Sequence, residues 1–226
     1  MTTTKKKTSD ADYPPEAPLD CPLCPRLVAF REENARKFPD WHNAPVDSFG
    51  PEDARLLVVG LAPGLRGANR TGRPFTGDWA GDLLYATLGK FGFTRGTYDS
   101  RPDDGLTLVD AMITNAVRCV PPENKPVGAE ANACRPFLTS RIAALPRLQA
   151  VLCLGKISHD NTLRALGHKL KHAAFGHAAT AQLDGPNGPV RLFDSYHCSR
   201  YNTNTGRLTE AMFDAVFADI RTYLDG

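Results

Sequence analysis

The sequence predicts an α/β layered fold built on a largely parallel sheet of four strands. Two observations support this fold class. Four short apolar runs alternate along the chain with longer segments whose apolar residues recur at helical spacing. Each run ends at a glycine or in polar residues, and in parallel sheets ligands bind outside the carboxyl ends of the strands. The 226 residues fit one sizeable domain, with or without a small appendage.

The chain is expected to begin with a tail and to continue as a single domain. Residues 1–20 are polar and contain several prolines, which predicts a disordered or loosely packed tail, and residues 21–226 form the domain. The apolar runs predict strands at 55–60, 111–117, 148–154 and 190–196. Apolar residues at helical spacing predict helices at 26–38, 79–93, 130–145, 157–166 and 208–224. The turn-forming stretch 176–189 and the polar stretch 197–207 are expected to be loops.

A long connector joins the first predicted strand to the helix after it. It runs from Gly60 to Asp82 and contains six glycines and three arginines. Connectors of this length are unusual in compact domains and are more often functional than accidental. Glycines let the backbone approach a ligand closely, and arginines suit phosphate groups. We therefore expect this connector to hold an anionic or planar ligand.

Composition and charge exclude several classes of protein. The hydrophobic content of 42% and the charged content of 23% are those of a soluble globular chain. A net charge of +2 is too small to indicate nucleic-acid binding on its own, and the run Lys5–Lys7 is typical of a solvated terminus. No stretch reaches the ~18 apolar residues of a membrane span, and the N-terminus lacks the apolar core of a signal peptide. The protein is expected to be cytoplasmic, without a membrane partner.

The spacing of the cysteines predicts a metal centre. Cys21 and Cys24 are separated by two residues, and Cys119 and Cys134 follow later in the chain. Disulfides are not expected without a secretion signal, whereas a C-x2-C pair lets two thiolates face one metal centre. The spacing alone does not distinguish zinc from an iron–sulfur cluster, because both accept four cysteines. Cys153 lies in an apolar strand and is expected in the core.

Polar residues stand at the ends of the predicted strands, where a site would form. Asp78 has two interpretations: it caps the helix beginning at Trp79, or it supplies a carboxylate that positions water or stabilises a developing cation. Asn115 lies within an apolar strand, so its amide must bond the backbone locally or read the edge of a ligand. His197 ends the fourth strand. One site could therefore gather the loop around Asp78 with Asn115 and His197.

The flanking residues suggest what such a site would bind. Phe75 is either core or a stacking platform for a base. The stretch after His197 carries hydroxyl, amide and arginine donors that suit a phosphate backbone.

These motifs together resemble those of a known enzyme family. GLAPG at 60–64, ANRTGRPFTGD at 68–78, TNAVRC at 114–119 and SYHCSRYNTNTGRLT at 195–209 resemble the motifs of iron–sulfur uracil-DNA glycosylases of family 5. The resemblance extends in order from Cys21 to the last helix. It implies a three-layer α/β/α fold with a four-stranded parallel sheet, and excision of uracil and other deaminated bases from DNA.

The resemblance also implies roles for individual residues. Phe75 would stack on the flipped base, Asn115 would read the uracil edge, and His197 would stabilise the departing uracil oxygen. The motif against the sugar and the attacking water would be Gly60, Leu61, Ala62, Pro63 and Gly64. That motif carries no polar side chain, as in family 5, which leaves Asp78 as the catalytic carboxylate. The expected DNA contacts are Arg70, Arg73, Ser199, Arg200, Tyr201, Asn202 and Arg207.

For the cysteines, the resemblance implies a [4Fe–4S] cluster held by Cys21, Cys24, Cys119 and Cys134. The chain departs from the family pattern at Cys198, where a proline is common, and at Gly64, where alanine is common. The expected partner is DNA containing uracil or another deaminated base such as hypoxanthine, and the protein is expected to be monomeric.

Two other functions are consistent with the sequence. One is a non-catalytic uracil-DNA-binding module that keeps the cluster, and it is suggested by the absence of an acidic residue in 61–64. The other is an iron–sulfur redox protein in which the pocket has no role.

Overall fold

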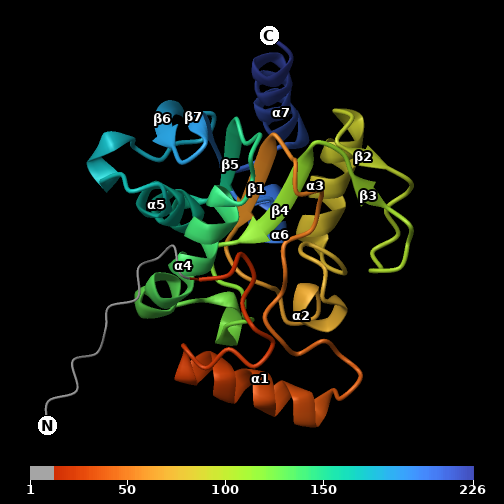
Figure 1. Ribbon diagram of the computed structural model, residues 1–226. Helices are drawn as coiled ribbons and strands as arrows, with labels where there is room; N and C mark the ends of the chain where they lie inside the picture. The colour runs from red at the N-terminus through yellow and green to blue at the C-terminus, as the bar shows by residue number, and fades with distance from the viewer. Residues whose placement is uncertain (1–12) are drawn as a thin grey trace, which may run out of the picture.

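The computed structural model describes residues 13–226 and contains a five-stranded sheet at its centre (Figure 1). The strand order is β4-β1-β5-β7-β6. Strands β4, β1, β5 and β7 are parallel, and β6 runs antiparallel to β7 at one edge. Their bounds are β1 Leu56–Gly60, β4 Ala111–Asn115, β5 Ala150–Leu154, β6 Thr180–Gly185 and β7 Gly188–Ser195. A second, two-stranded sheet pairs β2 Thr94–Arg95 with β3 Thr107–Leu108.

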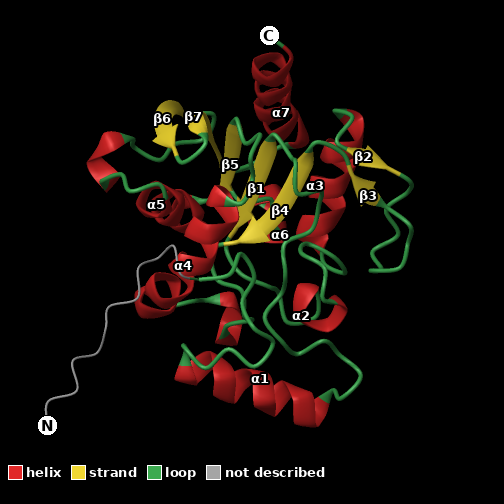
Figure 2. Ribbon diagram, viewed as in Figure 1, coloured by secondary structure: helices red, strands yellow, loops and turns green. Residues whose placement is uncertain are grey.

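Helices cover both faces of the large sheet (Figure 2). Successive residues of a strand point to opposite faces. In β1, Leu56 and Val58 pack in one core cluster with residues of α3 and α7, while Leu57 and Val59 pack in another with residues of α4 and α5. The helices are α1 Pro25–Lys37, α2 Ala68–Thr71, α3 Trp79–Lys90, α4 Gly128–Ala143, α5 Lys156–Ala165, α6 Arg200–Asn204 and α7 Glu210–Asp225, with 3₁₀ turns at Pro122–Asn124 and Leu170–His172. The predicted α/β/α layering is confirmed.

Three of the main helices begin at residues whose chemistry favours a helix N-terminus. Pro25 occupies the first turn of α1, where its missing N–H is not needed. The Asp78 side chain accepts a hydrogen bond from the Gly81 N–H and caps α3, and Thr209 caps α7 in the same way through Met212. Helix α1 lies beyond the carboxyl ends of the strands, away from the sheet (Figure 1).

The large sheet has five strands where four were predicted, because β6 lies in the stretch expected to be turns, and the two-stranded sheet of β2 and β3 was not predicted. Only Leu183 of β6 is buried, so the strand lacks the apolar alternation that reveals a half-buried strand. It is an edge strand that forms a hairpin with β7, and Gly185 pairs with Gly188 across the turn. The polar stretch 197–207 also differs from its predicted form, since it contains α6, capped by Ser199.

The predicted tail is also corrected in part. Residues 1–12 lie outside the described residues, but the segment from Tyr13 to Asp20 packs against the domain. Ala17 is buried, and Glu16 forms ion pairs with Arg118 at 2.7 Å and with Arg141 at 2.5 Å. Both arginines are buried, so Glu16 neutralises charges that would be costly to leave unpaired. The domain therefore begins before Cys21.

Candidate active site

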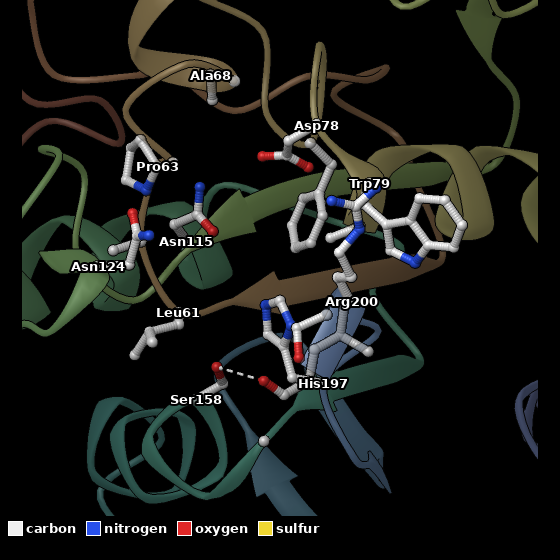
Figure 3. A pocket seen from close by; sticks show the side chains of 18 of the residues that line it. Leu61, Pro63, Ala68, Asp78, Trp79, Asn115, Asn124, Ser158, His197 and Arg200 are labelled. Atoms are coloured by element: carbon white, nitrogen blue, oxygen red, sulfur yellow. Dashed lines mark hydrogen bonds between the residues drawn. The ribbon is translucent and has the colours of Figure 1, made fainter. Parts of the chain in front are cut away.

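The carboxyl ends of the parallel strands open into one cleft of about 870 Å³ (Figure 3). The strand pairing aligns these ends, because Gly60 is in register with Asn115 and Leu154 with Ser195. Most of the predicted site residues line the cleft: Leu61, Ala62, Pro63, Gly64, Phe75, Asp78, Asn115, His197, Ser199 and Arg200. The structure thus brings the loop around Asp78 together with Asn115 and His197, as the sequence predicts.

Gly60 lies beneath the cleft and makes room for two of its side chains. A Cβ atom at this position would overlap Asn115 Oδ1 and would lie 2.6 Å from two ring atoms of Phe75. Phe75 itself has a φ of 52°, a left-handed conformation that is unfavourable for a bulky residue. Its carbonyl accepts a hydrogen bond from the Tyr98 hydroxyl at 3.1 Å, which helps to hold this conformation. The strained backbone turns the Phe75 ring into the cleft.

The amide of Asn115 is available for a ligand. Asn115 is 3% exposed, and its side chain makes no hydrogen bond with any other residue in the range 13–226. The local backbone bond considered from the sequence is therefore absent from the described part of the chain. An unpaired amide at the wall of a cleft is costly unless a ligand or water completes its hydrogen bonds. The group can donate and accept at once, which suits a planar edge that carries both functions.

Asp78 is both a helix cap and a wall of the cleft. Its Oδ1 accepts from the Gly81 N–H at 3.2 Å. Its Oδ2 lies against the glycines of the connector, since a Cβ at Gly64 would be 2.9 Å away and one at Gly67 would overlap it. Burial raises the pKa of this carboxyl above its usual range, against the hydrogen bonds of the Gly81 and Ala80 N–H groups, which lower it. The cap leaves one carboxylate oxygen free for chemistry.

His197 faces Phe75 across the cleft as a neutral ring. The two rings are nearly parallel, with centroids 5.9 Å apart and an interplanar angle of 26°. Burial lowers the pKa of His197 to about 4, and no carboxylate counteracts this effect. At neutral pH the imidazole therefore carries one N–H and can donate a single hydrogen bond without a positive charge. Its backbone carbonyl accepts from the Asn202 side chain at 2.8 Å, which fixes the loop that carries it.

Helix α6 places the other predicted DNA contacts at the edge of the cleft. Arg200 and Ser199 line it, and Tyr201 is 72% exposed beside them. Asn202 does not point outward as a DNA contact would, because its amide bonds the carbonyl of His197. The structure gives Asn202 a positioning role.

Three predicted arginines have different environments. Arg73 is buried, pairs with Asp104 through two hydrogen bonds of 2.7 and 2.8 Å, and donates to Thr76. The prediction that Arg73 contacts DNA was wrong, because its guanidinium is buried and paired with Asp104 inside the protein. Arg70 is exposed and lies near Gly77. Arg207 is exposed and lies 4.6 Å above the ring of Tyr196.

The fold brings the four predicted metal-binding cysteines into one region. Cys21 packs with Cys134, and Cys119 packs with Cys24, in two small buried clusters. The Arg118 N–H donates to Cys134 Sγ at 3.3 Å, and the Arg31 guanidinium donates to Cys119 Sγ at 3.5 Å. Burial, together with Cys119, raises the pKa of Cys24 to about 11, and burial raises that of Cys134 to about 12. Within residues 13–226, no three cysteine, histidine or acidic side chains converge closely enough for a single metal ion.

The remaining cysteines and one histidine have structural contacts. Cys153 is fully buried in β5, as predicted, and its thiol donates to Thr162 at 3.3 Å. Cys198 is also buried and donates to the Ala80 carbonyl, which ties the loop after β7 to the start of α3. His159 is 1% exposed, and its Nδ1 lies 2.9 Å from Asp194 Oδ1.

Several residues of the cleft could not be selected from the sequence. Asn124 lines it from the 3₁₀ turn after Cys119, and Lys156, Ile157 and Ser158 line it from the start of α5. Glu123 and Asn124 both have positive φ angles, 54° and 57°, so this turn is strained. The prolines around it indicate a turn, but only the fold places its amide opposite Asn115 (Figure 3). No helix in the described part of the chain is both long and apolar enough to span a membrane.

Comparison with known proteins identifies the family. Residues 48–221 match the model of the uracil DNA glycosylase superfamily. The chain is 43% identical to a type-5 uracil-DNA glycosylase of Thermus thermophilus, over 89% of this chain and 92% of that protein. It is 42% identical to a type-5 uracil-DNA glycosylase of Mycobacterium leprae, over 89% and 90% of the two chains. A third, from Pyrobaculum aerophilum, is 39% identical over 84% and 83%.

The matched region contains the cleft, the strand ends that form it and the helices that cover the sheet. The chain therefore belongs to the uracil-DNA glycosylase superfamily.

Proposed function

We propose that this protein excises uracil from DNA by hydrolysing the N-glycosidic bond, which leaves an abasic site. The observation that carries the proposal is the convergence of the Asn115 amide, the Phe75 ring, His197 and Asp78 in one cleft of a superfamily member. The named relatives are glycosylases, so neither a non-catalytic binding module nor a redox protein is favoured.

Base recognition is assigned to Phe75 and Asn115. The part of the Phe75 ring that lines the cleft would stack on a base that has left the helix, and stacking accepts any planar base. The unpaired amide of Asn115 would accept from uracil N3–H and donate to O4. Cytosine presents an acceptor and a donor at the same positions, so an amide held in the orientation that suits uracil would leave both groups unmatched. This mismatch supports discrimination against the normal base.

Bond cleavage is assigned to His197 and Asp78. When the C1′–N1 bond breaks, its electron pair leaves with the base, so uracil becomes an anion and the sugar gains positive charge. The neutral His197 ring would donate its N–H to the uracil oxygen on which the negative charge grows. The free oxygen of Asp78 would stabilise the sugar cation or orient the water that adds to C1′. The water supplies hydroxide to the sugar and a proton to balance the uracil anion.

The surface around the cleft would hold the DNA strand. Arg70 and Arg200 are exposed cations beside the cleft, Ser199 and Tyr201 add hydroxyl groups, and Arg207 is exposed farther along the same segment. Such groups bind phosphates without regard to sequence, and they would compensate for the few kcal/mol needed to extrude a nucleotide.

The range of bases is proposed to extend beyond uracil. The connector residues that line the cleft next to Gly60, which are Leu61, Ala62 and Pro63, are small or aliphatic, and none carries a bulky ring that would exclude a substituted base. We expect hypoxanthine or 5-substituted uracil to be released as well. A substrate panel tests this, and release of uracil alone would contradict it.

The four cysteines are proposed to hold a [4Fe–4S] cluster. Their thiols come together from the segment before α1, the segment after β4 and α4, which supports a centre held by four thiolates. The N–H groups of Arg31 and Arg118 donate hydrogen bonds to two of the cysteine sulfurs, which stabilises thiolate ligands. The cluster would join α1, α4 and the segment after β4, and we assign it no step of the reaction.

A base-excision assay tests the function. The protein is incubated with a duplex that carries one uracil, and strand breaks are counted after alkaline treatment. Breaks at the uracil are expected with the wild type, and a loss of at least ~10²-fold is expected with His197→Ala. No breaks with the wild type, or an unchanged rate with the variant, would contradict the assignment.

The cluster is tested separately by iron and sulfide analysis with visible absorption. Cys134→Ser should lower the iron content, whereas Cys153→Ser should leave it unchanged.

A further inference from the structure

Trp79 is an exposed aromatic residue at the edge of the cleft with no role in the reaction described above. It is the first residue of α3, directly after Asp78, and it is 45% exposed. It lines the main cleft and also a shallower groove of about 380 Å³ that continues outward along Arg70, Gly77, Asp82 and Arg200. The indole thus stands where a DNA strand would leave the cleft.

One face of the indole is covered by a cation without a carboxylate partner. The Arg200 guanidinium lies 5.0 Å from the centre of the Trp79 ring, alongside it in Figure 3. Arg200 forms no ion pair with any other residue of the range 13–226. The edge of the indole is fixed, because Trp79 Nε1 donates to Thr203 Oγ1 at 3.1 Å. The ring is therefore held in place while the group on its face is free to be exchanged.

We infer that Trp79 is a stacking platform for the nucleobase next to the extruded nucleotide, and that Arg200 covers this platform until DNA binds. On binding, the Arg200 guanidinium moves to a backbone phosphate and the neighbouring base takes its place on the indole. The inference rests on the proposed action on DNA, since it assigns a second subsite to the same strand.

The relative strength of the two contacts favours this exchange. A cation on an exposed aromatic face raises the equilibrium constant for the contact by about 2- to 5-fold. A base stacked on an aromatic side chain raises the binding constant by about 5- to 150-fold. The displaced guanidinium also gains a charge-assisted contact with a phosphate group. Within the described residues Arg200 has no such anionic partner.

The charges around the platform match a strand that crosses it. Arg70 and Arg200 line the groove with Trp79, so two guanidinium groups are available for consecutive phosphates. Asp82 also lines this groove, and its Oδ1 accepts from the Ser100 hydroxyl at 3.1 Å. A base stacked on Trp79 would separate the phosphates from this carboxylate.

Tryptophan fluorescence tests the inference directly, because the chain contains two tryptophans, Trp41 and Trp79. Trp41 stacks on Phe38 at a centroid distance of 4.0 Å, and its replacement by phenylalanine leaves Trp79 as the sole reporter. The probe is a duplex that carries a tetrahydrofuran abasic analogue, which is bound but not cleaved. We expect the Trp79 emission to fall on binding, with the same affinity that an anisotropy titration of the labelled duplex gives. Binding by anisotropy without any change in emission would overturn the inference.

Substitutions separate stacking from a structural role. Trp79→Ala is expected to weaken binding of the duplex by about 5- to 150-fold, and Trp79→Phe should recover most of the affinity because a ring remains. Thr203→Val removes the hydrogen bond to the indole but keeps the ring and should change the affinity by less than about 3-fold. Equal losses in Trp79→Ala and Thr203→Val would overturn the inference, since Trp79 would then act by holding α6. Binding by wild type without uracil release would instead contradict the proposed function and leave the stacking result valid.

Discussion

Asp78 offers the sharpest test of the site, because it makes a structural and a chemical contribution through different oxygens. Oδ1 caps α3 through the Gly81 N–H, while Oδ2 faces the connector glycines at the wall of the cleft. Asp78→Ala removes both oxygens. Asp78→Asn keeps a side-chain oxygen for the cap, since asparagine is as good an N-cap as aspartate, but it removes the charge.

The two variants should differ in stability and agree in activity. Loss of the cap in Asp78→Ala should cost about 1 kcal/mol, which lowers Tm by roughly 2–4 °C in a chain of this size. Asp78→Asn should retain the wild-type Tm or exceed it. Both should lose about 10²- to 10³-fold in the single-turnover rate of uracil release, because neither carries the carboxylate.

The pH dependence of stability gives the same test a second measurement. Burial raises the pKa of Asp78 in the folded protein, so the folded state binds the proton more tightly than the unfolded chain does. The stability contributed by this group is fully present below the unfolded pKa of about 4 and is lost as the pH rises through the folded pKa. The Tm advantage of Asp78→Asn over the wild type should therefore grow between about pH 4 and pH 7.

Thermal unfolding and rapid-quench assays of the two variants at several pH values are the measurements. If Asp78→Asn released uracil within about threefold of the wild-type rate while Asp78→Ala did not, the carboxylate would be a cap and the mechanism would need another group.

Three further predictions concern other parts of the site. The pKa of about 4 at His197 implies that uracil release varies little with this group between about pH 5.5 and 8, and a rate that falls as the pH rises through 6.5 would indicate a charged imidazole. Gly60→Ala should reduce uracil release by more than about 10²-fold, because its Cβ would overlap Asn115 and press on Phe75, whereas the control Gly128→Ala meets no atom within 4 Å and should be as active as the wild type. Arg73→Gln should destabilise the fold by about 3–5 kcal/mol in denaturant unfolding, because it leaves the buried Asp104 without its ion-pair partner, and it should not change the salt dependence of DNA binding. Arg70→Gln should leave the stability unchanged and reduce the salt dependence of DNA affinity in a salt titration.

Much of the fold could be predicted because it follows local patterns. The apolar runs that became β1, β4 and β5 are buried on both faces, and the capping residues that begin α3 and α7 act within a few positions of the chain. Strand β6 could not be predicted, because an edge strand with one buried side chain has almost no apolar pattern. Helix α6 is too short to display a periodicity.

The residues of the site likewise divide into those that local sequence reveals and those that only the fold places. Phe75, Asp78, Asn115 and His197 could be selected because each stands at a strand end or in the long connector beside it. Arg73 could not be distinguished from Arg70, because its partner Asp104 lies 31 residues away along the chain. Asn124 acquires its position at the cleft only from tertiary contacts. In general, the sequence around a charged residue does not reveal which distant residue pairs with it when it is buried.

The segment from Asn115 to Asn124 joins the base pocket to the cysteine region through continuous backbone. The N–H groups of Ala116 and Val117 bond to the carbonyls of Gly60 and Leu61, and the Arg118 N–H donates to Cys134. Because these contacts follow one another along the chain, the amides of residues 116–118 should exchange with solvent as one cooperative unit with α4. Oxidation of the cysteines would then loosen the base pocket first, while the central sheet remains folded.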